Sequence, residues 1–319
     1  MKVANSGPAA AQTAARALPG QVARRSRLRV GQATLVSLLY LLPSLIVFTV
    51  FVFYPLFKSF YLSLYATNPF GLSTGVYVGL KQYNIILHSQ TYHDSLLVTL
   101  LYTLYTVPLG VLVALTLAVL ANAQVRGIAV FRTLFALPVG VSMAAAALVF
   151  ALFYNPTAGV FNYWLRSLGL DGVQWLTEPR PALWSVAFVS IWAGLGFNFI
   201  ILLSGIQAIP EDIYESAKID GASGFRLFRS ITLPLLSPTL FFVLVISIIS
   251  AFQSFTQIDL LTKGGPANST NVVVYSIYRD AFINSQVGYA SAQAVVLFLI
   301  MLVLTAIQFL VIEPRVHYS

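Results

Sequence analysis

The chain of 319 residues contains no cysteine and very little charge. Without cysteine it can form neither disulfides nor thiolate metal sites. Charged residues make up 9% of the sequence, whereas a soluble domain carries about 25%. Hydrophobic residues make up 58%. Most of the molecular surface must therefore contact something other than water, which indicates a membrane protein.

Signatures of catalysis and of cofactor binding are also missing. No G-x-x-x-x-G-K-[ST] loop occurs, so we expect no ATP site of that kind. Gly194 and Gly196 resemble the start of a dinucleotide fingerprint, but the third glycine is absent and the pair lies within an apolar run. His88 and His93 have no evident third partner, which favours an exposed pair over a metal site. We therefore expect no catalytic residues, no metal and no cofactor on this chain.

Long uncharged segments dominate what is present. Six charge-free runs of 28 to 33 residues occur, and a spanning helix needs roughly 20 apolar residues. A seventh run, 59–80, contains proline and several glycines, and unpaired backbone cannot face lipid. We therefore predict an all-α integral membrane protein with six transmembrane helices. The predicted spans are about 34–57, 95–120, 131–153, 182–208, 235–258 and 290–312.

The distribution of lysine and arginine predicts the orientation of the chain, because cytoplasmic loops carry an excess of both. With the N-terminus inside, twelve of the 18 cations lie on the inner side and six on the outer side. Both termini are therefore predicted to be cytoplasmic. The net charge of +8 follows from this bias, so we expect no nucleic-acid partner. Arg24 to Arg29 precede the first span, where anionic membrane lipid attracts basic residues.

The chain divides into four predicted parts. Residues 1–30, rich in Ala, Arg, Gln and Ser, are predicted to form a disordered basic cytoplasmic tail. A signal peptide is the alternative, but the apolar run that follows exceeds the usual length of about 7–15 residues. Residues 31–94 hold the first span and an extracytoplasmic loop, 95–312 the other five spans with the loop 210–234, and 313–319 a cytoplasmic tail.

No Asp, Glu, Lys or His lies at the middle of any predicted span. Proton-driven transporters usually keep ionisable residues there, so proton coupling is disfavoured, whereas sodium coupling through carbonyl groups stays open. No inverted repeat is visible either. If the protein pumps a solute, the energy must come from elsewhere. A secondary transporter or channel, and a membrane scaffold or enzyme, are the alternatives from other classes.

The segment Pro210 to Pro234, between the fourth and fifth spans, holds seven of the 28 charged residues. Pro210 suits the start of a helix, and Glu211 and Asp212 complement the helix dipole in its first turn. Gly221 is predicted to end this helix with a positive φ. A second helix then begins near residue 225.

A short helix, a turn of small residues and a second helix form a blunt surface. Small side chains would let another protein approach the backbone. A helix lying on the membrane, with Arg226 and Arg229 at the headgroups, fits the composition nearly as well. Composition and spacing leave both possibilities open.

The same segment resembles the E-A-A…G…I-x-L-P signature of permease subunits of binding-protein-dependent ABC importers. Ser216 stands where the family usually has alanine, a nearly isosteric change. The resemblance covers roughly residues 30–319 and implies the type I ABC importer permease fold. It assigns coupling to an ATPase to Glu215, Ser216, Ala217, Asp220, Gly221, Ala222, Ile231, Leu233 and Pro234.

Further expectations follow from the resemblance. Such permeases pair as two membrane subunits above two ABC ATPase subunits, and an extracytoplasmic binding protein delivers the solute. ATP and Mg would then be bound by the partner ATPase. The resemblance thus implies a transporter subunit, not an enzyme, in the inner (cytoplasmic) membrane.

Within this family the chain is most similar to sugar and glycerol-3-phosphate importers. This implies sn-glycerol-3-phosphate or glycerophosphodiesters as solute. An uncharged sugar or oligosaccharide is the alternative, because no cation lies at mid-span to meet a phosphate. The segments that resemble the glycerol-3-phosphate branch are Pro69-Phe70-Gly71, Val78-Gly79-Leu80, Ile258-Asp259, Gly264-Gly265-Pro266, Ile277-Tyr278-Arg279, Ser291-Ala292-Gln293 and Thr305-Ala306-Ile307-Gln308-Phe309.

Polar residues within the spans are candidates for the solute pathway. They are Asn198 in the fourth span and Ser250, Gln253, Ser254 and Gln257 in the fifth. Gln253 and Gln257 are four residues apart, so they would share one face of a continuous helix. Hydrogen bonding between helices, which contributes about 0.6–2 kcal/mol in membranes, is the alternative role.

Overall fold

A computed structural model of the chain describes residues 37–66, 75–123 and 125–315. The predicted tail 1–30 lies outside the described residues, as do residues 316–319 of the predicted C-terminal tail, His317 among them, and the segment Pro69-Phe70-Gly71. The chain divides into two compact units, Met1–Lys58 and Ser59–Ser319.

A single long helix, Ser37–Leu62, begins in the first unit. It includes a π-helical turn, η1 (Thr49–Phe53), and continues into α2 (Tyr54–Leu62). Its 26 residues are enough to cross a bilayer. The helix therefore runs a few residues beyond the predicted end of the first span at 57.

Three more elements of the second unit are unbroken spans: α4 (Gln90–Ala121), α8 (Pro179–Gln207) and the helix Val287–Val311, which comprises α15 (Val287–Ile307) and the first part of η5 (Gln308–Ile312). Two further spans are bent. In the third span, α5 (Ile128–Ala136) and η2 (Leu137–Gly140) meet α6 (Met143–Phe153) at 102°. In the fifth, α10 (Gly224–Leu227), η3 (Phe228–Thr232) and α11 (Leu233–Leu235) meet α12 (Ser237–Phe252) at 69°.

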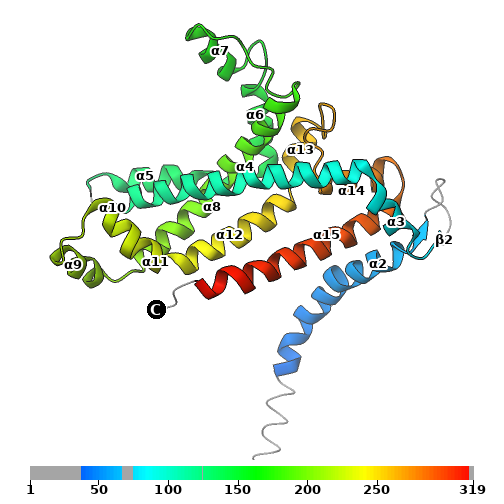
Figure 1. The fold of residues 1–319 in the computed structure, drawn as a ribbon, viewed down its shortest axis with the longest axis horizontal. Coiled ribbons are helices and arrows are strands. Elements are labelled where there is room, and N and C mark those ends of the chain that lie inside the picture. Colours follow the sequence, from blue (N-terminus) through cyan, green and yellow to red (C-terminus); the bar gives the residue numbers. More distant parts are fainter. Residues whose placement is uncertain (1–36, 67–74, 124, 316–319) are drawn as a thin grey trace, which may run out of the picture. The chain divides into compact units, whose positions relative to one another are not determined.

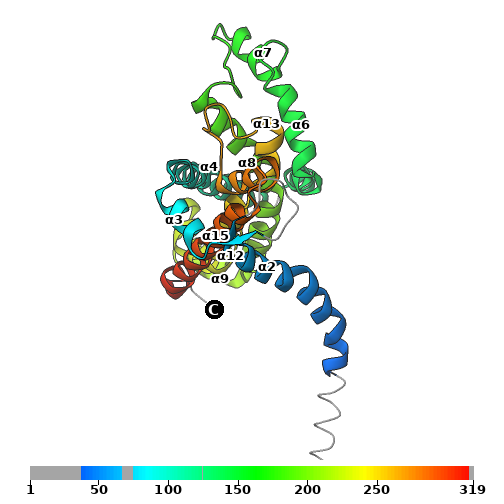
Figure 2. The same ribbon diagram turned by 90° about the vertical axis from the view of Figure 1, so that its right-hand side faces the viewer.

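Within the described residues, counting each bent pair as one span gives the six spans that the charge-free runs predict. The second unit packs α4, α8, α12 and α15 side by side (Figure 1). At one end of this bundle lie α9 (Glu211–Ile219) and α10, and at the other lie α3 (Lys81–His88) and α14 (Val273–Tyr278). Helices α6 and α7 (Val160–Ser167) project from the bundle, as both views show (Figures 1 and 2).

Small residues let the two longest helices approach closely, as is typical of helix pairs in membranes. On α4 the buried positions include Gly110, Ala114 and Ala118, which recur at four-residue spacing. Facing them, α8 contributes Phe199 and Leu202 to the same buried cluster. The bundle core is therefore held by close packing and not by charge.

Short elements complete the fold. Strand β1 (Tyr65–Ala66) pairs antiparallel with β2 (Val76–Tyr77), with Tyr65 opposite Tyr77. The remaining elements are α13 (Thr256–Leu261), η4 (Arg279–Ile283) and η6 (Glu313–Arg315).

The outer part of the fifth span differs from the prediction of one helix to residue 258. Helix α12 ends at Phe252, and Phe255, with φ −138° and ψ −59°, separates it from α13. Gln253 and Gln257 therefore do not share a helical face. Beside the break, the side chains of Ser254 and Gln257 hydrogen-bond to Tyr102 on α4, and this tertiary contact stabilises the broken conformation.

Candidate functional site

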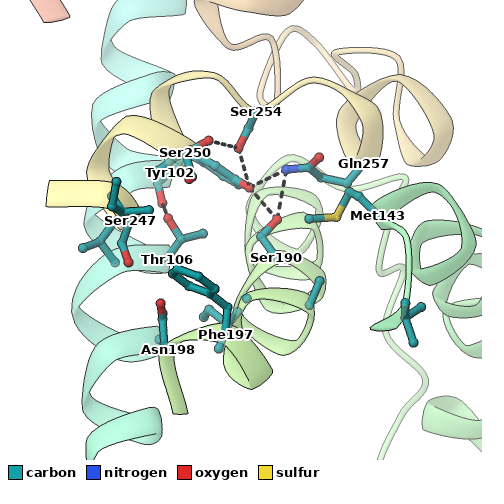
Figure 3. A pocket seen from close by; sticks show the side chains of 18 residues that line it. Tyr102, Thr106, Met143, Ser190, Phe197, Asn198, Ser247, Ser250, Ser254 and Gln257 are labelled. Atoms are coloured by element: carbon teal, nitrogen blue, oxygen red, sulfur yellow. Dashed lines mark hydrogen bonds between the residues drawn. The ribbon is translucent and has the colours of Figure 1, made fainter. Parts of the chain in front are cut away.

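A cavity of about 320 Å³ lies among α4, α8 and α12, next to the bend in the third span and the break between α12 and α13 (Figure 3). Among the described residues that line it, none is charged. Apolar side chains such as Val107, Ile191 and Phe197 form part of the wall. The polar lining residues are Tyr102, Thr106, Ser190, Asn198, Ser247, Ser250, Ser254 and Gln257.

A hydrogen-bond network around Tyr102 joins three elements at this cavity (Figure 3). The Tyr102 side chain is fully buried, and its Oη lies 2.5 Å from Oγ of Ser190 on α8. Nε2 of Gln257 donates to Tyr102 Oη at 2.8 Å and to Ser190 Oγ at 3.0 Å. Ser254 Oγ lies 3.2 Å from the same phenolic oxygen. The network thus fixes α13 against α4 and α8.

Local hydrogen bonds explain why hydroxyl residues are tolerated in these apolar helices. Thr106 Oγ1 donates to the carbonyl oxygen of Tyr102 at 2.8 Å, and Ser190 Oγ donates to that of Val186 at 3.2 Å. A hydroxyl that bonds back to its own helix carries no unpaired donor into the membrane. Its lone pairs stay available to a neighbour or a ligand.

The carboxamide of Gln257 is used on one side only. Its Nε2 makes two hydrogen bonds, whereas its Oε1 accepts none from the residues that the structure describes. Gln257 lines the cavity. Gln257 thus keeps one hydrogen-bond acceptor that no described residue uses.

Of the five residues predicted for the solute pathway, four line the cavity: Asn198, Ser250, Ser254 and Gln257. Gln253 does not, because it caps the end of α12 and is exposed. Tyr102 and Ser190, which also line the cavity, are not among the residues predicted from the sequence. A tyrosine and a serine inside long apolar runs were the available signal, but only the fold shows that they meet.

The cavity can form hydrogen bonds but offers no group for acid–base or nucleophilic chemistry. Its lining holds hydroxyls and carboxamides without a titratable partner such as histidine or a carboxylate. In the part of the chain that the structure describes, no group of three or more His, Asp or Glu residues could hold a metal ion. The arrangement suits binding and release of a solute.

The segment 210–234 forms a second candidate surface at the α9 end of the bundle (Figure 1). Helix α9 ends in two hydrogen bonds: Gly221 N donates to Lys218 O at 3.0 Å, and Ala222 N donates to Ala217 O at 2.9 Å. This pair of bonds is the Schellman motif, which requires a left-handed residue after the helix. Gly221 has φ +81°, so its predicted positive φ is confirmed.

Two large apolar side chains are exposed on this surface, although the ring of Phe225 lies 6.2 Å from that of Phe228. Ile219 is 86% exposed and Phe225 is 73% exposed. Charged residues surround them, including Glu215, Arg226 and Arg229, all exposed. Exposed apolar groups inside a polar rim are typical of a protein contact.

The structure places the nine predicted coupling residues in two groups. Glu215, Ser216, Asp220 and Gly221 are exposed at the tip, on α9 and the turn after it. Ala217, Ala222, Ile231, Leu233 and Pro234 are half-buried beneath the tip and along the second helix. The first group is therefore available for contact, and the second supports it.

Few side-chain contacts hold α9 in place. Tyr214 Oη lies 3.2 Å from Thr232 Oγ1 and so joins α9 to η3. Behind them is a hollow of about 430 Å³ whose lining includes Val119, Ile206 and Phe228. Helix α9 is thus held at its ends and by Tyr214, with space between it and the bundle.

Comparison with known proteins finds one matching family model and several similar proteins. Residues 71–318 match the model of the family described as binding-protein-dependent transport system inner membrane component. The chain is 38% identical over 280 residues to the sn-glycerol-3-phosphate transport system permease protein UgpA of Agrobacterium fabrum, covering 87% of this chain and 94% of that protein. It is 39% identical over 280 residues to UgpA of Rhizobium meliloti, with the same coverage, and 36% identical over 278 residues to UgpA of Escherichia coli O157:H7.

Similarity to solved structures points to the same kind of protein as the sequence relatives do. A chain of a bacterial alginate ABC transporter, in complex with an alginate pentasaccharide-bound periplasmic protein, superimposes with a TM-score of 0.76 at 26% identity, covering 87% of this chain and 93% of that one. A second structure, of a bacterial ABC transporter involved in the import of alginate, gives a TM-score of 0.74.

Proposed function

The chain belongs to the family of binding-protein-dependent transport system inner membrane components, and on that premise we propose that it forms half of the solute pathway of an importer driven by a separate ATPase. It is a permease component of a binding-protein-dependent ABC importer and a multi-pass protein of the inner membrane. It has the type I importer permease fold. Both termini are proposed to be cytoplasmic.

We propose that the surface formed by residues 210–234 docks the ATPase. The observation that carries this proposal is the exposed apolar pair Ile219 and Phe225 beside the left-handed turn at Gly221. A lipid contact would require the apolar groups to face the membrane, yet α9 lies at the tip of the bundle with charged residues around it. ATP and Mg would be bound by that partner.

The solute is proposed to be sn-glycerol-3-phosphate or a glycerophosphodiester. The support is the identity of 38% to permeases of sn-glycerol-3-phosphate transport systems. The uncharged cavity suits the hydroxyl groups of the glycerol part. A phosphate favours Arg, Lys or helix N-termini, so its charge would be met by the second permease subunit or by the binding protein.

An uncharged sugar or oligosaccharide is the second candidate. It is favoured by the same observation, since hydroxyls and carboxamides next to apolar side chains suit any polyhydroxylated solute. The partners proposed for either solute are a second permease, an ABC ATPase dimer and an extracytoplasmic binding protein.

One experiment tests the whole proposal. The chain is reconstituted in liposomes with its second permease, ATPase and binding protein, and uptake of labelled sn-glycerol-3-phosphate is measured with and without ATP. We expect ATP-dependent uptake that unlabelled glycerophosphodiesters reduce and that neutral sugars do not. Competition by a neutral sugar alone would favour the second candidate. Uptake by this chain alone, without ATP, would contradict the proposal and support a secondary transporter or channel.

A further inference from the structure

An amphipathic arm of the molecule is not used by the proposed function. It consists of α7 and the connections 154–159 and 168–178, which join α6 to α8. Helix α7 lies at the far end of the projecting α6 in both views (Figures 1 and 2). Its two faces differ in what they contact.

The inner face of α7 is rigidly fixed. Asn162 is buried and uses its whole carboxamide: Nδ2 donates to the carbonyl oxygens of Pro156 and Val173, both at 3.0 Å. Its Oδ1 accepts from Val173 N at 3.0 Å and from Trp175 Nε1 at 2.9 Å. The loop around α7 is therefore a folded structure that holds the helix in one orientation.

The outer face of α7 is apolar and aromatic. Tyr163 is 70% exposed, Trp164 is 59% exposed, and Leu168, one turn beyond Trp164, is 76% exposed. The nearest cation, Arg166, does not interrupt this face, because its guanidinium donates to the carbonyl oxygens of Pro156 at 2.9 Å and Thr157 at 3.3 Å. Tryptophan and tyrosine beside leucine are the composition of membrane–water interfaces.

Ring contacts place the inner face of α7 beside the outer part of α8. The ring of Phe161, on the inner face, lies 5.8 Å from that of Phe153 at the end of α6 and 6.4 Å from that of Phe188 on α8. Phe188 lies about 13 Å along the helix axis from Pro179, the start of α8, at 1.5 Å per residue. A headgroup layer is only about 5–8 Å thick on each side. With the start of α8 at the membrane surface, Phe188 therefore lies below the headgroup layer.

We propose that α7 is an interfacial helix whose Tyr163, Trp164 and Leu168 insert into the lipid of the outer leaflet and anchor the outer half of the broken third span. The membrane lipid is thus the occupant of this face. An interfacial helix buries its apolar side about 5–10 Å into the boundary between headgroups and acyl chains. The anchor would hold α6 while the 102° break between η2 and α6 accommodates movement of the bundle.

The absence of native cysteine allows a direct test. We label Leu168→Cys with a nitroxide in the assembled importer, whose partner subunits are free of reactive cysteine. Asp171→Cys, three residues away, is labelled in the same way as a matched control. The complex is reconstituted in liposomes of phosphatidylethanolamine and phosphatidylglycerol. We then compare two collision rates of the label. One is with oxygen, which partitions into lipid, and the other is with a water-soluble nickel chelate.

We expect oxygen to relax the label at 168 more strongly than the chelate does, and the reverse at 171. A label at 168 that the chelate reaches as readily as at 171 would mean that the face lies in water, and the proposal would be wrong. A label that neither reagent reaches would mean that a protein subunit covers the face, which also overturns the proposal. If Leu168→Cys does not assemble, Tyr163→Cys on the same face replaces it.

Discussion

Tyr102 of α4 and Gln257 of α13 are joined by a 2.8 Å hydrogen bond although 155 residues separate them in the sequence. Ser190 of α8 completes the triangle, 2.5 Å from the phenolic oxygen and 3.0 Å from Nε2 of Gln257. The wall of the cavity therefore depends on three elements that the chain brings together from distant segments. This makes the phenolic hydroxyl a sensitive point for mutation.

Tyr102→Phe should lower both stability and apparent solute affinity. The change leaves buried partners without the hydroxyl, at a cost of about 1–3 kcal/mol. Thermal unfolding of the purified complex and the KM of ATP-driven uptake measure the two effects. Tyr105→Phe is the matched control, because Tyr105 stacks on Trp184 at 3.9 Å and does not line the cavity. Equal behaviour of the two variants would show that the network has no functional role.

Gln257→Leu should impair uptake more than Gln253→Leu does. Gln257 is buried at the cavity with an Oε1 that no described residue uses, whereas Gln253 is exposed at the end of α12. The two variants make the same chemical change four residues apart. The KM for solute and the ATPase rate stimulated by the binding protein should both change in the first variant. If Gln253→Leu has the larger effect, the pathway does not pass this cavity.

These residues show how far the sequence could predict the site. The six spans follow from the charge-free runs, and the turn at Gly221 follows from one glycine after a short amphipathic helix. The break at Phe255 could not be predicted in this way, because residues 253–257 are compatible with a helix by local propensity. Hydrogen bonds from Ser254 and Gln257 to Tyr102 stabilise the break, and such long-range partners are invisible to local patterns.

Glu215→Ala should weaken docking of the ATPase. The carboxylate is exposed in the isolated chain, and on docking it would become one partner of a buried polar contact, whose truncation typically costs about 2–5 kcal/mol. Co-purification of the ATPase with the permease pair should fall, together with ATP-driven uptake. Glu178→Ala removes an equally exposed carboxylate at the opposite end of α8 and should leave both unchanged. Unchanged co-purification in Glu215→Ala would exclude the proposed role.

Gly221→Val should uncouple ATP hydrolysis from uptake. Gly221 has φ +81°, where a β-branched residue is strongly disfavoured, so the Schellman closure of α9 would be lost. Gly127 offers a matched control: its φ is +85°, no atom lies within 4 Å of a Cβ built there, and it precedes α5 outside the docking surface. Gly127→Val should carry similar backbone strain without uncoupling. Full transport by Gly221→Val would mean that the turn is dispensable.

Gly196→Ala should destabilise the contact between α8 and the broken third span. A Cβ at this position would lie 2.6 Å from the backbone nitrogen of Val139 and 2.8 Å from the carbonyl oxygen of Ala136, and neither backbone atom can move alone. Overpacking of this kind typically costs about 1–3 kcal/mol. Gly194→Ala, two residues earlier, meets no atom within 4 Å and should leave the unfolding temperature unchanged. A lowered unfolding temperature in Gly196→Ala alone would show that the close approach of α8 to η2 is what holds the bend, whereas equal temperatures would mean that η2 can shift away from α8 without cost.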